Sequence, residues 1–384
     1  MDFFIRIPFL FLITGITAFF YFESNYQKLK QVDYVKLQES TLDETFITSI
    51  GTDKNYANMV AIQPYMIPAD YSSETRFYEK LESYIIKAKR SGFLKERTTI
   101  IFPDHIGTPL YLIDERREVY TSKTLDDMFS NLNSTKYPNL KRTNFTTKID
   151  LTKYLLDEKS KLVKDTYVST FSKLALFYKV NILAGSIVLP ISSLSNGELK
   201  FIENDRKVYG FMFDNKGKIT QKVERKYLYS FETDFLTPGK PPEEGLVVPG
   251  IPNKMAVLFS GDTLLPVSYT RIIQVTDLWV SPAFKLTTEN MDYSKLEISG
   301  EVQNPSKSTF KESDSLLTSR ELWNKFSTPG RHASTSSKSY IQVFLNGEFY
   351  DYKLDSWSCA NSKSSGRQEF IEPRKTSAIL NLNL

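Results

Sequence analysis

The chain has 384 residues, of which 41% are hydrophobic, so it can bury a large core and is long enough for more than one domain. Lysine and arginine number 49 against 45 acidic residues, and these charges are spread along the chain, which argues against a nucleic-acid partner. The single cysteine, Cys359, and the two histidines, His105 and His332, exclude a disulfide framework and a cysteine-rich or histidine-rich metal centre, and we expect neither a metal nor another cofactor.

The amino-terminal segment is strongly apolar. From Ile7 to Phe22 it reads IPFLFLITGITAFFYF, a run without a charged residue that follows Arg6. A helix needs about 20 apolar residues to span a bilayer, and the aromatic end of this run suits the membrane interface. We therefore predict a transmembrane anchor or signal-anchor over residues 1–22. The alternative is a cleaved secretory signal, although no clear small-x-small cleavage site follows the apolar run.

Two signals disagree about the side of the membrane on which the domain lies. Lys28, Lys30 and Lys36 follow the apolar run and favour a cytoplasmic domain. The scarcity of cysteine and the export-like amino terminus favour the opposite side. We expect a single-pass membrane protein and lean towards an extracytoplasmic domain.

Polar residues fill positions 23–55, which we predict to be a stalk. The apolar run 59–63 ends at a proline and is typical of a buried strand. Apolar residues at helical spacing over 73–90 predict an amphipathic helix, and 98–102 returns to a strand pattern. A strand, a helix and a second strand in about forty residues indicate a layered α/β domain.

The same kinds of element recur further along the chain. A helix is predicted at 165–179, and strands are predicted at 182–189, 208–213, 255–259, 278–280 and 340–345. We place the whole domain at 56–357. Residues 300–339 are rich in Ser, Thr, Lys and Glu, which predicts a loop-rich insertion, and 358–384 are predicted to be a flexible tail.

Three short motifs stand at the ends of predicted strands. They are Phe102 to His105 (FPDH), Glu224 to Leu228 (ERKYL) and Leu258 to Asp262 (LFSGD). Together they supply carboxylates, a cation and a hydroxyl, which an open α/β sheet would place at the carboxyl ends of its strands. These motifs are therefore the candidate functional site.

The order of these motifs closely resembles that of the carbon-nitrogen hydrolase, or nitrilase, superfamily. The similarity runs from about Asn58 to Ser281, or at most to Tyr352. Further matching segments are 181–190 (NILAGSIVLP), 213–217 (FDNKG), 235–239 (FLTPG) and 280–282 (VSP). The resemblance implies a four-layer αββα sandwich.

The resemblance also implies a catalytic set, which this chain has altered. Asp104 stands at the position of the family's glutamate, Lys226 at its lysine and Ser260 at its nucleophilic cysteine. In the family a thiolate attacks the substrate carbon, the glutamate transfers protons and the lysine supports the oxyanion. A serine hydroxyl is harder to ionise than a thiol, and aspartate is one methylene shorter than glutamate. Together the two changes favour an inactive or much altered site.

Other interpretations of these positions stay open. Ser260 either fills the former cysteine pocket, or lines a ligand pocket without chemistry, or acts as a nucleophile with Lys226 as its base. Asp104 is alternatively a loop-capping residue.

Three accessory positions complete the candidate site. His105 is a possible replacement base, although adjacent residues at a strand end usually point to opposite sides. Glu232 is either a carboxylate near the active cation or an exposed charge in a turn. For Asp262 we expect a structural hydrogen-bonding role.

These observations leave two classes of function. The one we favour is a membrane-anchored, degenerate and non-catalytic relative that acts in binding or scaffolding. The alternative is an amide hydrolase or acyl transferase that uses Ser260 with Lys226 on a small amide or acyl compound. The resemblance also implies a homo-oligomer, because members of the family commonly associate.

Overall fold

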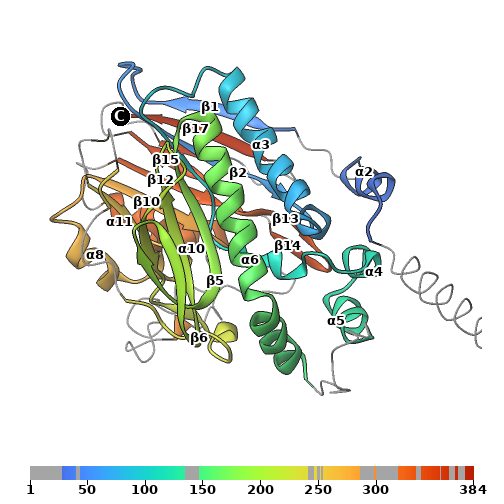
Figure 1. The fold of residues 1–384 in the computed structure, drawn as a ribbon. Helices are drawn as coiled ribbons and strands as arrows, with labels where there is room; N and C mark the ends of the chain where they lie inside the picture. The colour runs from blue at the N-terminus through green and yellow to red at the C-terminus, as the bar shows by residue number, and fades with distance from the viewer. Residues whose placement is uncertain are drawn as a thin grey trace, which may run out of the picture.

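A computed structural model describes the fold of most of the chain (Figure 1). The described residues are 28–39, 44–134, 147–240, 246–248, 251, 254–285, 298–299, 319–333, 339–354, 356–362, 368–370 and 377–384. Within them, no helix is both long and apolar enough to cross a bilayer. The apolar run predicted as an anchor, 7–22, lies outside the described residues.

The first half of the described chain alternates strands with helices. Its elements are α2 (Gln31–Glu39), β1 (Phe46–Ile50), β2 (Asn58–Gln63), β3 (Tyr65–Met66), η1 (Pro68–Tyr71), α3 (Glu74–Arg90), β4 (Thr98–Ile101), η2 (Thr108–Leu112), α4 (Arg117–Thr121), α5 (Leu125–Ser134), α6 (Lys148–Tyr178), β5 (Asn181–Ser195), β6 (Glu198–Phe213) and β7 (Ile219–Glu224).

The second half of the described chain supplies the remaining strands and four further α-helices. Its elements are β8 (Leu228–Tyr229), η3 (Ser230–Glu232), β9 (Met255–Val257), α7 (Ser260–Leu264), α8 (Pro266–Ile272), β10 (Leu278–Ala283), β11 (Ile298–Ser299), α10 (Ser319–Phe326), α11 (Thr328–Ala333), β12 (Ser339–Phe344), β13 (Asn346–Phe349), β14 (Tyr352–Leu354), β15 (Cys359–Asn361), β16 (Gln368–Phe370) and β17 (Ala378–Asn383).

Two large sheets form the centre of the molecule. The first has the strand order β1-β17-β2-β4-β5-β6-β7, and the second has the order β16-β15-β12-β10-β9. Neighbouring strands β2, β4 and β5 are parallel, as are β9, β10 and β12, so each sheet places several strand carboxyl ends at one edge. The strand, helix and strand predicted from 59 to 102 are confirmed as β2, α3 and β4.

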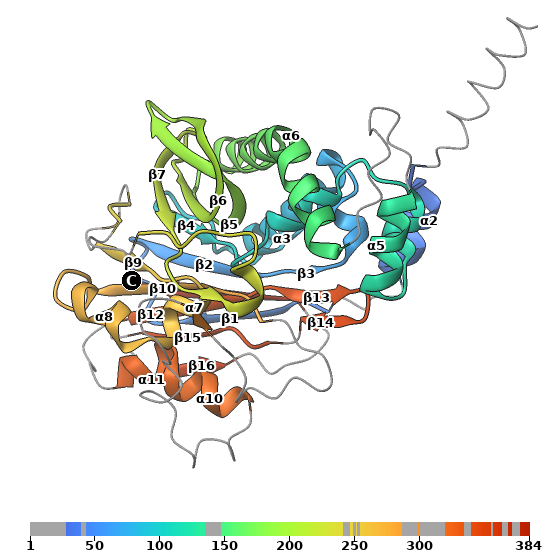
Figure 2. The same ribbon diagram turned by 90° about the horizontal axis from the view of Figure 1, so that it is seen from below.

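Each of the two sheets is covered on both faces, so its strands carry apolar side chains on both sides. In β2, Val60 and Ile62 pack with α3 and α6, whereas Met59 and Ala61 face the second sheet. On the far face of the second sheet, side chains of α8, such as Ile272, pack against β10 and β12. The result is the αββα arrangement of helices, sheet, sheet and helices, which Figure 2 shows from the side. Strands buried on both faces read as continuous apolar runs.

Helix α6 is longer than the sequence pattern predicts. It begins at Lys148, after Thr147 caps it by accepting a hydrogen bond from the Asp150 amide, and not near 165. Its first turns carry many charged residues, but Leu151, Leu155 and Leu156 are buried there at helical spacing, a pattern that the prediction overlooked. The helix ends where Lys179 takes a left-handed conformation with φ of 55°.

The prediction of a flexible tail over 358–384 is wrong. Strand β17 lies between β1 and β2, parallel to the first and antiparallel to the second. Its side chains Ile379 and Leu380 are fully buried. This short apolar run is held by strands more than 300 positions earlier in the chain, a contact that local sequence patterns do not reveal.

The polar stalk and the loop-rich insertion are also partly wrong. Within the predicted stalk, β1 joins the first sheet, and α2 packs on the domain through the buried side chain of Tyr34, next to the buried Leu29 that precedes the helix. Within the predicted insertion, α10 and α11 form helices, and Trp323 of α10 packs against Phe344 at 5.1 Å between ring centres. The remaining residues of the predicted insertion, 300–318 and 334–338, lie outside the described part of the chain.

Candidate functional site

The three predicted motifs meet at the carboxyl ends of β4, β7 and β9. Hydrogen bonds extend two of these strands by one residue, from the Phe102 amide to Leu183 O at 2.9 Å and from the Leu258 amide to Val280 O at 3.0 Å. Gly185 makes room for the turn after β4, because a Cβ atom there would lie 2.1 Å from the carbonyl oxygen of Pro103. Its φ of +67° also favours glycine. Chain segments far apart in sequence thus converge on one buried point.

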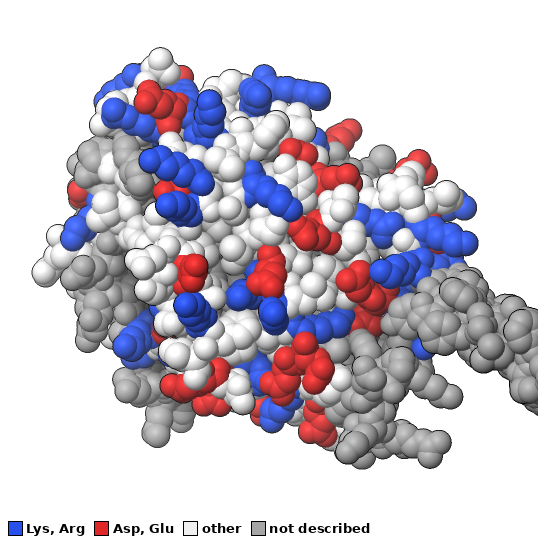
Figure 3. Space-filling model, in the orientation of Figure 1, with Lys and Arg blue, Asp and Glu red and all other residues white. Residues whose placement is uncertain are grey.

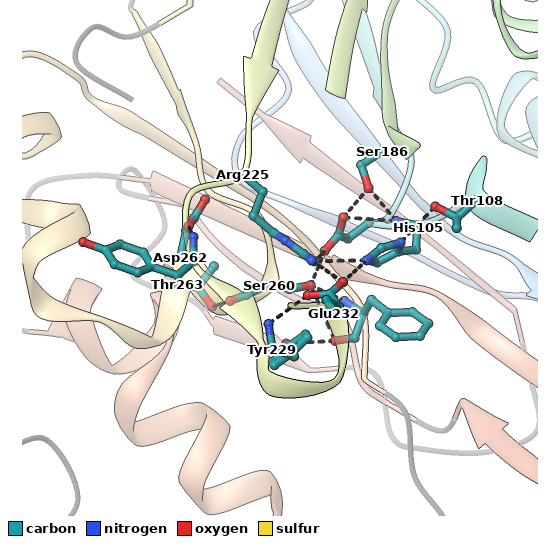
Figure 4. A network of polar contacts seen from close by, with 12 residues as sticks. His105, Thr108, Ser186, Arg225, Tyr229, Glu232, Ser260, Asp262 and Thr263 are labelled. Carbon is teal, nitrogen blue, oxygen red and sulfur yellow. Dashed lines mark hydrogen bonds and ion pairs between the residues drawn. The ribbon is translucent and has the colours of Figure 1, made fainter. Parts of the chain in front are cut away.

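Asp104 lies at the centre of this point and is fully buried. Its Oδ2 atom accepts hydrogen bonds from Arg225 Nη1 at 3.0 Å and from Ser260 Oγ. Its Oδ1 atom accepts from Ser186 Oγ and from the His105 amide at 3.1 Å. Both carboxylate oxygens are therefore satisfied, as a buried charge requires. Figure 4 shows this network.

Arg225 joins two carboxylates. Its guanidinium donates from Nη1 to Asp104 and from Nη2 to Glu232 Oε1, and no part of the side chain is exposed. Burial alone would lower the pKa of Arg225, but Glu232 and Asp104 more than offset this and raise it. Burial alone would likewise raise the pKa of Glu232, whereas Arg225 and His105 lower it to about 2. The Glu232 carboxylate also accepts from the Tyr229 amide at 2.8 Å.

His105 turns towards the same ion pair. Its φ of 57° is left-handed and redirects the chain directly after Asp104. Its Nε2 atom lies 3.1 Å from Glu232 Oε1 and 3.0 Å from Arg225 Nη1, and its Nδ1 atom lies 2.9 Å from Thr108 Oγ1. We expected the side chains of Asp104 and His105 to point to opposite sides, as neighbours do in an extended strand. This expectation is wrong, because the backbone at His105 is left-handed and not extended.

Ser260 begins helix α7 in a strained conformation, with φ of 26°. Its hydroxyl donates to Asp104 and accepts from the Phe284 amide at 2.8 Å, and the side chain is fully buried. The next residue is Gly261, where a Cβ atom would lie 2.6 Å from the carbonyl oxygen of Tyr227. The tight packing of α7 against the loop after β7 therefore fixes the position of the hydroxyl.

Asp262 holds that loop in place. Its carboxylate accepts from the Tyr227 amide at 2.8 Å and from the Lys226 amide at 3.2 Å. Burial raises the pKa of Asp262 to about 7, although these amides and Arg225 act in the opposite direction. The hydrogen bonds agree with the structural role that we expected for this residue.

The cation beside Asp104 is Arg225, which corrects the prediction of Lys226. The Lys226 ammonium lies 5.4 Å from the ring centre of its neighbour Tyr227, and the side chain is partly exposed. A signal for Arg225 was present in the sequence, because side chains in an extended segment alternate between two faces. Val223, Arg225 and Tyr227 all point inward and are buried.

Sequence reasoning also missed Ser186 and the Phe284 amide as partners of the site. Both lie on or directly after other strands of the sheets, in β5 and after β10, so only the packed fold brings them close. Glu232, in contrast, is the buried accessory carboxylate and not an exposed turn charge. Among the residues described, no group of three or more His, Cys, Asp or Glu side chains is arranged to hold a metal ion.

The arrangement brings the side chains of Asp104, Arg225 and Ser260 together, and these groups determine what it can do chemically. A guanidinium donates hydrogen bonds and does not accept a proton in proteins, so Arg225 can stabilise negative charge without acting as a base. Asp104 accepts the hydrogen bond that the Ser260 hydroxyl donates. The negative charge of the Asp104 carboxylate is already balanced by Arg225. A carboxylate balanced in this way is a weak activator of a serine hydroxyl.

No protein-family model and no curated protein sequence matches the chain. Among solved structures, a carbon-nitrogen hydrolase from Helicobacter pylori G27 is similar with a TM-score of 0.50 and 11% identity, over 85% of this chain and 89% of that one. An amidase from Nesterenkonia sp. is similar with a TM-score of 0.49 and 11% identity, over 87% of this chain and 92% of that one. A mutant of the Nesterenkonia AN1 amidase, described as from the nitrilase superfamily, has a TM-score of 0.48 and 11% identity, over 87% of this chain and 93% of that one. At 11% identity the similarity to the Helicobacter pylori structure concerns the fold, and this chain has the fold of a carbon-nitrogen hydrolase.

Proposed function

We propose that this protein is a non-catalytic relative of the carbon-nitrogen hydrolases that acts in binding or scaffolding. The observation that carries the proposal is the buried ion pair of Arg225 with Asp104 and Glu232. It occupies the place where the resemblance implies a lysine beside the family's catalytic glutamate. The longer guanidinium side chain offsets the shorter aspartate, so the contact persists at 3.0 Å while its acid-base chemistry is lost.

The surroundings of Ser260 support the same conclusion. The Ser260 hydroxyl oxygen already accepts a hydrogen bond from the Phe284 amide, and the hydroxyl donates a hydrogen bond to Asp104. Its side chain has no exposed surface, so a substrate carbon reaches the oxygen only if neighbouring chain moves aside. A hydroxyl with both hydrogen-bonding roles filled and no solvent access behaves as part of the core.

One observation favours the alternative, an amide hydrolase or acyl transferase that uses Ser260. The strained φ of 26° at a strand-to-helix turn and the hydrogen bond to a carboxylate are features that nucleophiles share. The base for Ser260 would then be Asp104, which accepts the hydrogen bond of its hydroxyl. Lys226 would not be the base, because its ammonium lies against the ring of Tyr227. The substrate would then be a small amide or acyl compound.

Reaction with a serine-directed fluorophosphonate distinguishes the two. The full chain is incubated with the probe and its mass is measured, with Ser260→Ala as the matched control. We expect no adduct on either protein. An adduct on the wild-type chain that is absent from Ser260→Ala, and slowed by Asp104→Asn, would overturn the non-catalytic proposal.

We also propose that residues 1–22 attach the protein to a membrane as a single-pass anchor, with the folded domain on the extracytoplasmic side. Support comes from the uncharged run of Ile7 to Phe22. The full chain should stay with membranes through an alkaline wash, and a variant lacking residues 1–22 should be released. A mature protein that begins near Glu23 would show instead that the segment is a cleaved signal.

We also propose that the protein forms a homo-oligomer, as the resemblance implies. Support comes from the end of α6, where Leu176 is 57% exposed and Phe177 is 70% exposed. Large apolar side chains exposed side by side are typical of association surfaces. Mass photometry of the detergent-solubilised chain should show a multimer, and Leu176→Glu with Phe177→Glu should reduce it to the monomer. A monomeric wild-type protein would contradict this part of the proposal.

A further inference from the structure

Helix α2 is the first described helix after the apolar segment, and it is fixed firmly to the domain. The Tyr34 hydroxyl donates to Asp70 Oδ1 at 2.9 Å, and Gln38 Nε2 donates to the same atom at 2.7 Å. Asp70 lies in η1, is fully buried, and also accepts from the Ile67 amide at 2.8 Å. A buried carboxylate therefore holds the inner face of α2.

Arg76 of helix α3 adds a second attachment. Its guanidinium lies 4.6 Å from the ring centre of Tyr34 and donates to Leu29 O at 2.9 Å. The same side chain donates to Ser72 Oγ at 2.7 Å, which fixes its own position. With both attachments in place, α2 has a defined orientation, and so does the face that it turns away from the domain.

That outer face is apolar at its centre and carries charges of both signs around it, because Glu39 is exposed on the same side of the helix as Lys36. Val32 is 65% exposed and Val35 is 41% exposed, and Lys36 next to them is exposed as well. Positions spaced by three and four residues lie on one side of a helix, so these three side chains form one surface. Lys30, just before the helix, is also exposed. Figure 3 shows Lys and Arg side chains gathered around α2 and α4, with acidic side chains beside them.

The length of chain before α2 limits what can cover this face. The apolar run ends at Phe22, and eight residues, 23–30, separate it from Gln31. Even fully extended, eight residues span roughly 26–29 Å. If the apolar run lies in a bilayer, α2 is therefore tethered close to the lipid surface.

We propose that the outer face of α2 rests on the lipid surface, with Val32 and Val35 at the boundary between head groups and acyl chains and with Lys30 and Lys36 near lipid phosphates. This inference rests on the membrane attachment proposed above. Exposed valines flanked by lysines suit this boundary, because lysine places its stem in apolar surroundings and its ammonium among head groups. Lipid is favoured over a protein partner because the chain itself brings lipid within reach. The docked helix would then fix how the whole domain is oriented against the membrane.

The experiment measures how close individual positions lie to lipid. The full chain with Cys359→Ser carries one new cysteine, Val32→Cys or Val35→Cys, labelled with an environment-sensitive fluorophore. It is reconstituted into vesicles of phosphatidylethanolamine and phosphatidylglycerol. Matched controls are Val267→Cys and Val275→Cys, because both valines are 46% exposed. Val267 lies in α8 and Val275 follows that helix by three residues, and α8 lies on the opposite side of the molecule from α2 (Figures 1 and 2).

Lipids with a spin label near the head group should quench the labels at 32 and 35 at least about twofold more than those at 267 and 275, because interfacial helices lie 5–10 Å deep. Equal quenching at all four positions in protein that floats with the vesicles would overturn the inference and leave membrane attachment intact. Protein that does not float with the vesicles would refute the attachment itself, and the inference with it. Quenching at 32 and 35 in a variant that lacks residues 1–22 would show that this face binds lipid without the anchor, and would support the inference independently of the attachment.

Discussion

The guanidinium of Arg225 lies 3.0 Å from the carboxylate of Asp104, with both side chains fully buried, and this contact joins the loop after β7 to the end of β4. Removing one partner of a buried ion pair leaves the other charged and unpaired, which costs about 3–5 kcal/mol. Arg225→Met should therefore lower the free energy of unfolding by about that amount, as measured by urea denaturation. Lys226→Met is the control, and it should change stability by less than about 1 kcal/mol. Equal effects of the two substitutions would contradict the assignment of Arg225 as the buried cation.

Glu232 should make the protein less stable in acid. Its pKa in the folded protein is about 2, below the value of about 4.3 that glutamate has in an unfolded chain. The unfolded state then binds the proton first, so this contribution is complete above about pH 4.5 and is lost as the pH falls towards 2. Its size is on the order of 3 kcal/mol. Glu232→Gln should flatten the dependence of the unfolding free energy on pH in this acidic range, and an unchanged slope would contradict the prediction.

Asp262 should act in the opposite direction. Burial raises its pKa in the folded protein to about 7, above the unfolded value of about 3.9, so the folded state retains a proton that the unfolded state has released. Its contribution is fully present below about pH 4 and is lost as the pH rises through 7. Asp262→Asn should make the unfolding free energy nearly constant between pH 5 and 8, whereas the wild-type value declines. A wild-type free energy that rises over this range would refute the assignment.

If the proposed function is right, position 260 should become a reactive nucleophile only when all three positions change. Asp104→Glu, Arg225→Lys and Ser260→Cys together restore the residue types that the resemblance implies, and the thiol at 260 should then alkylate faster with iodoacetamide. The double change Asp104→Glu with Ser260→Cys is the matched control, because it leaves the guanidinium in place. Both proteins carry Cys359→Ser, so that position 260 holds the only thiol.

We expect the triple variant to react about tenfold faster or more than the double variant, because nucleophile, base and cation act as a unit. Equal rates in the two variants would show that Arg225 does not limit the site. Adding Lys226→Met to the triple variant should leave the rate unchanged, since Lys226 is not the cation beside Asp104.

The sequence predicts the layered fold and the positions of Asp104 and Ser260 because these depend on local patterns. Buried strands such as β2 and β4 are continuous apolar runs, and polar residues follow them directly. The choice between Arg225 and Lys226 depended on which face of an extended segment points inward, and the motif alone did not settle it. The left-handed turn at His105 could not be predicted from the sequence, because it depends on a hydrogen bond from the His105 amide to Ser186 in another strand.

Strand β17 imposes an order on how the sheet is completed. Its neighbours β1 and β2 come early in the sequence, yet β1 reaches the rest of the first sheet only through β17. During synthesis, β1 therefore has to wait until residues 378–383 have emerged, and the apolar edge of β2 stays uncovered for as long. Until then, that uncovered strand edge is a site at which another chain can pair.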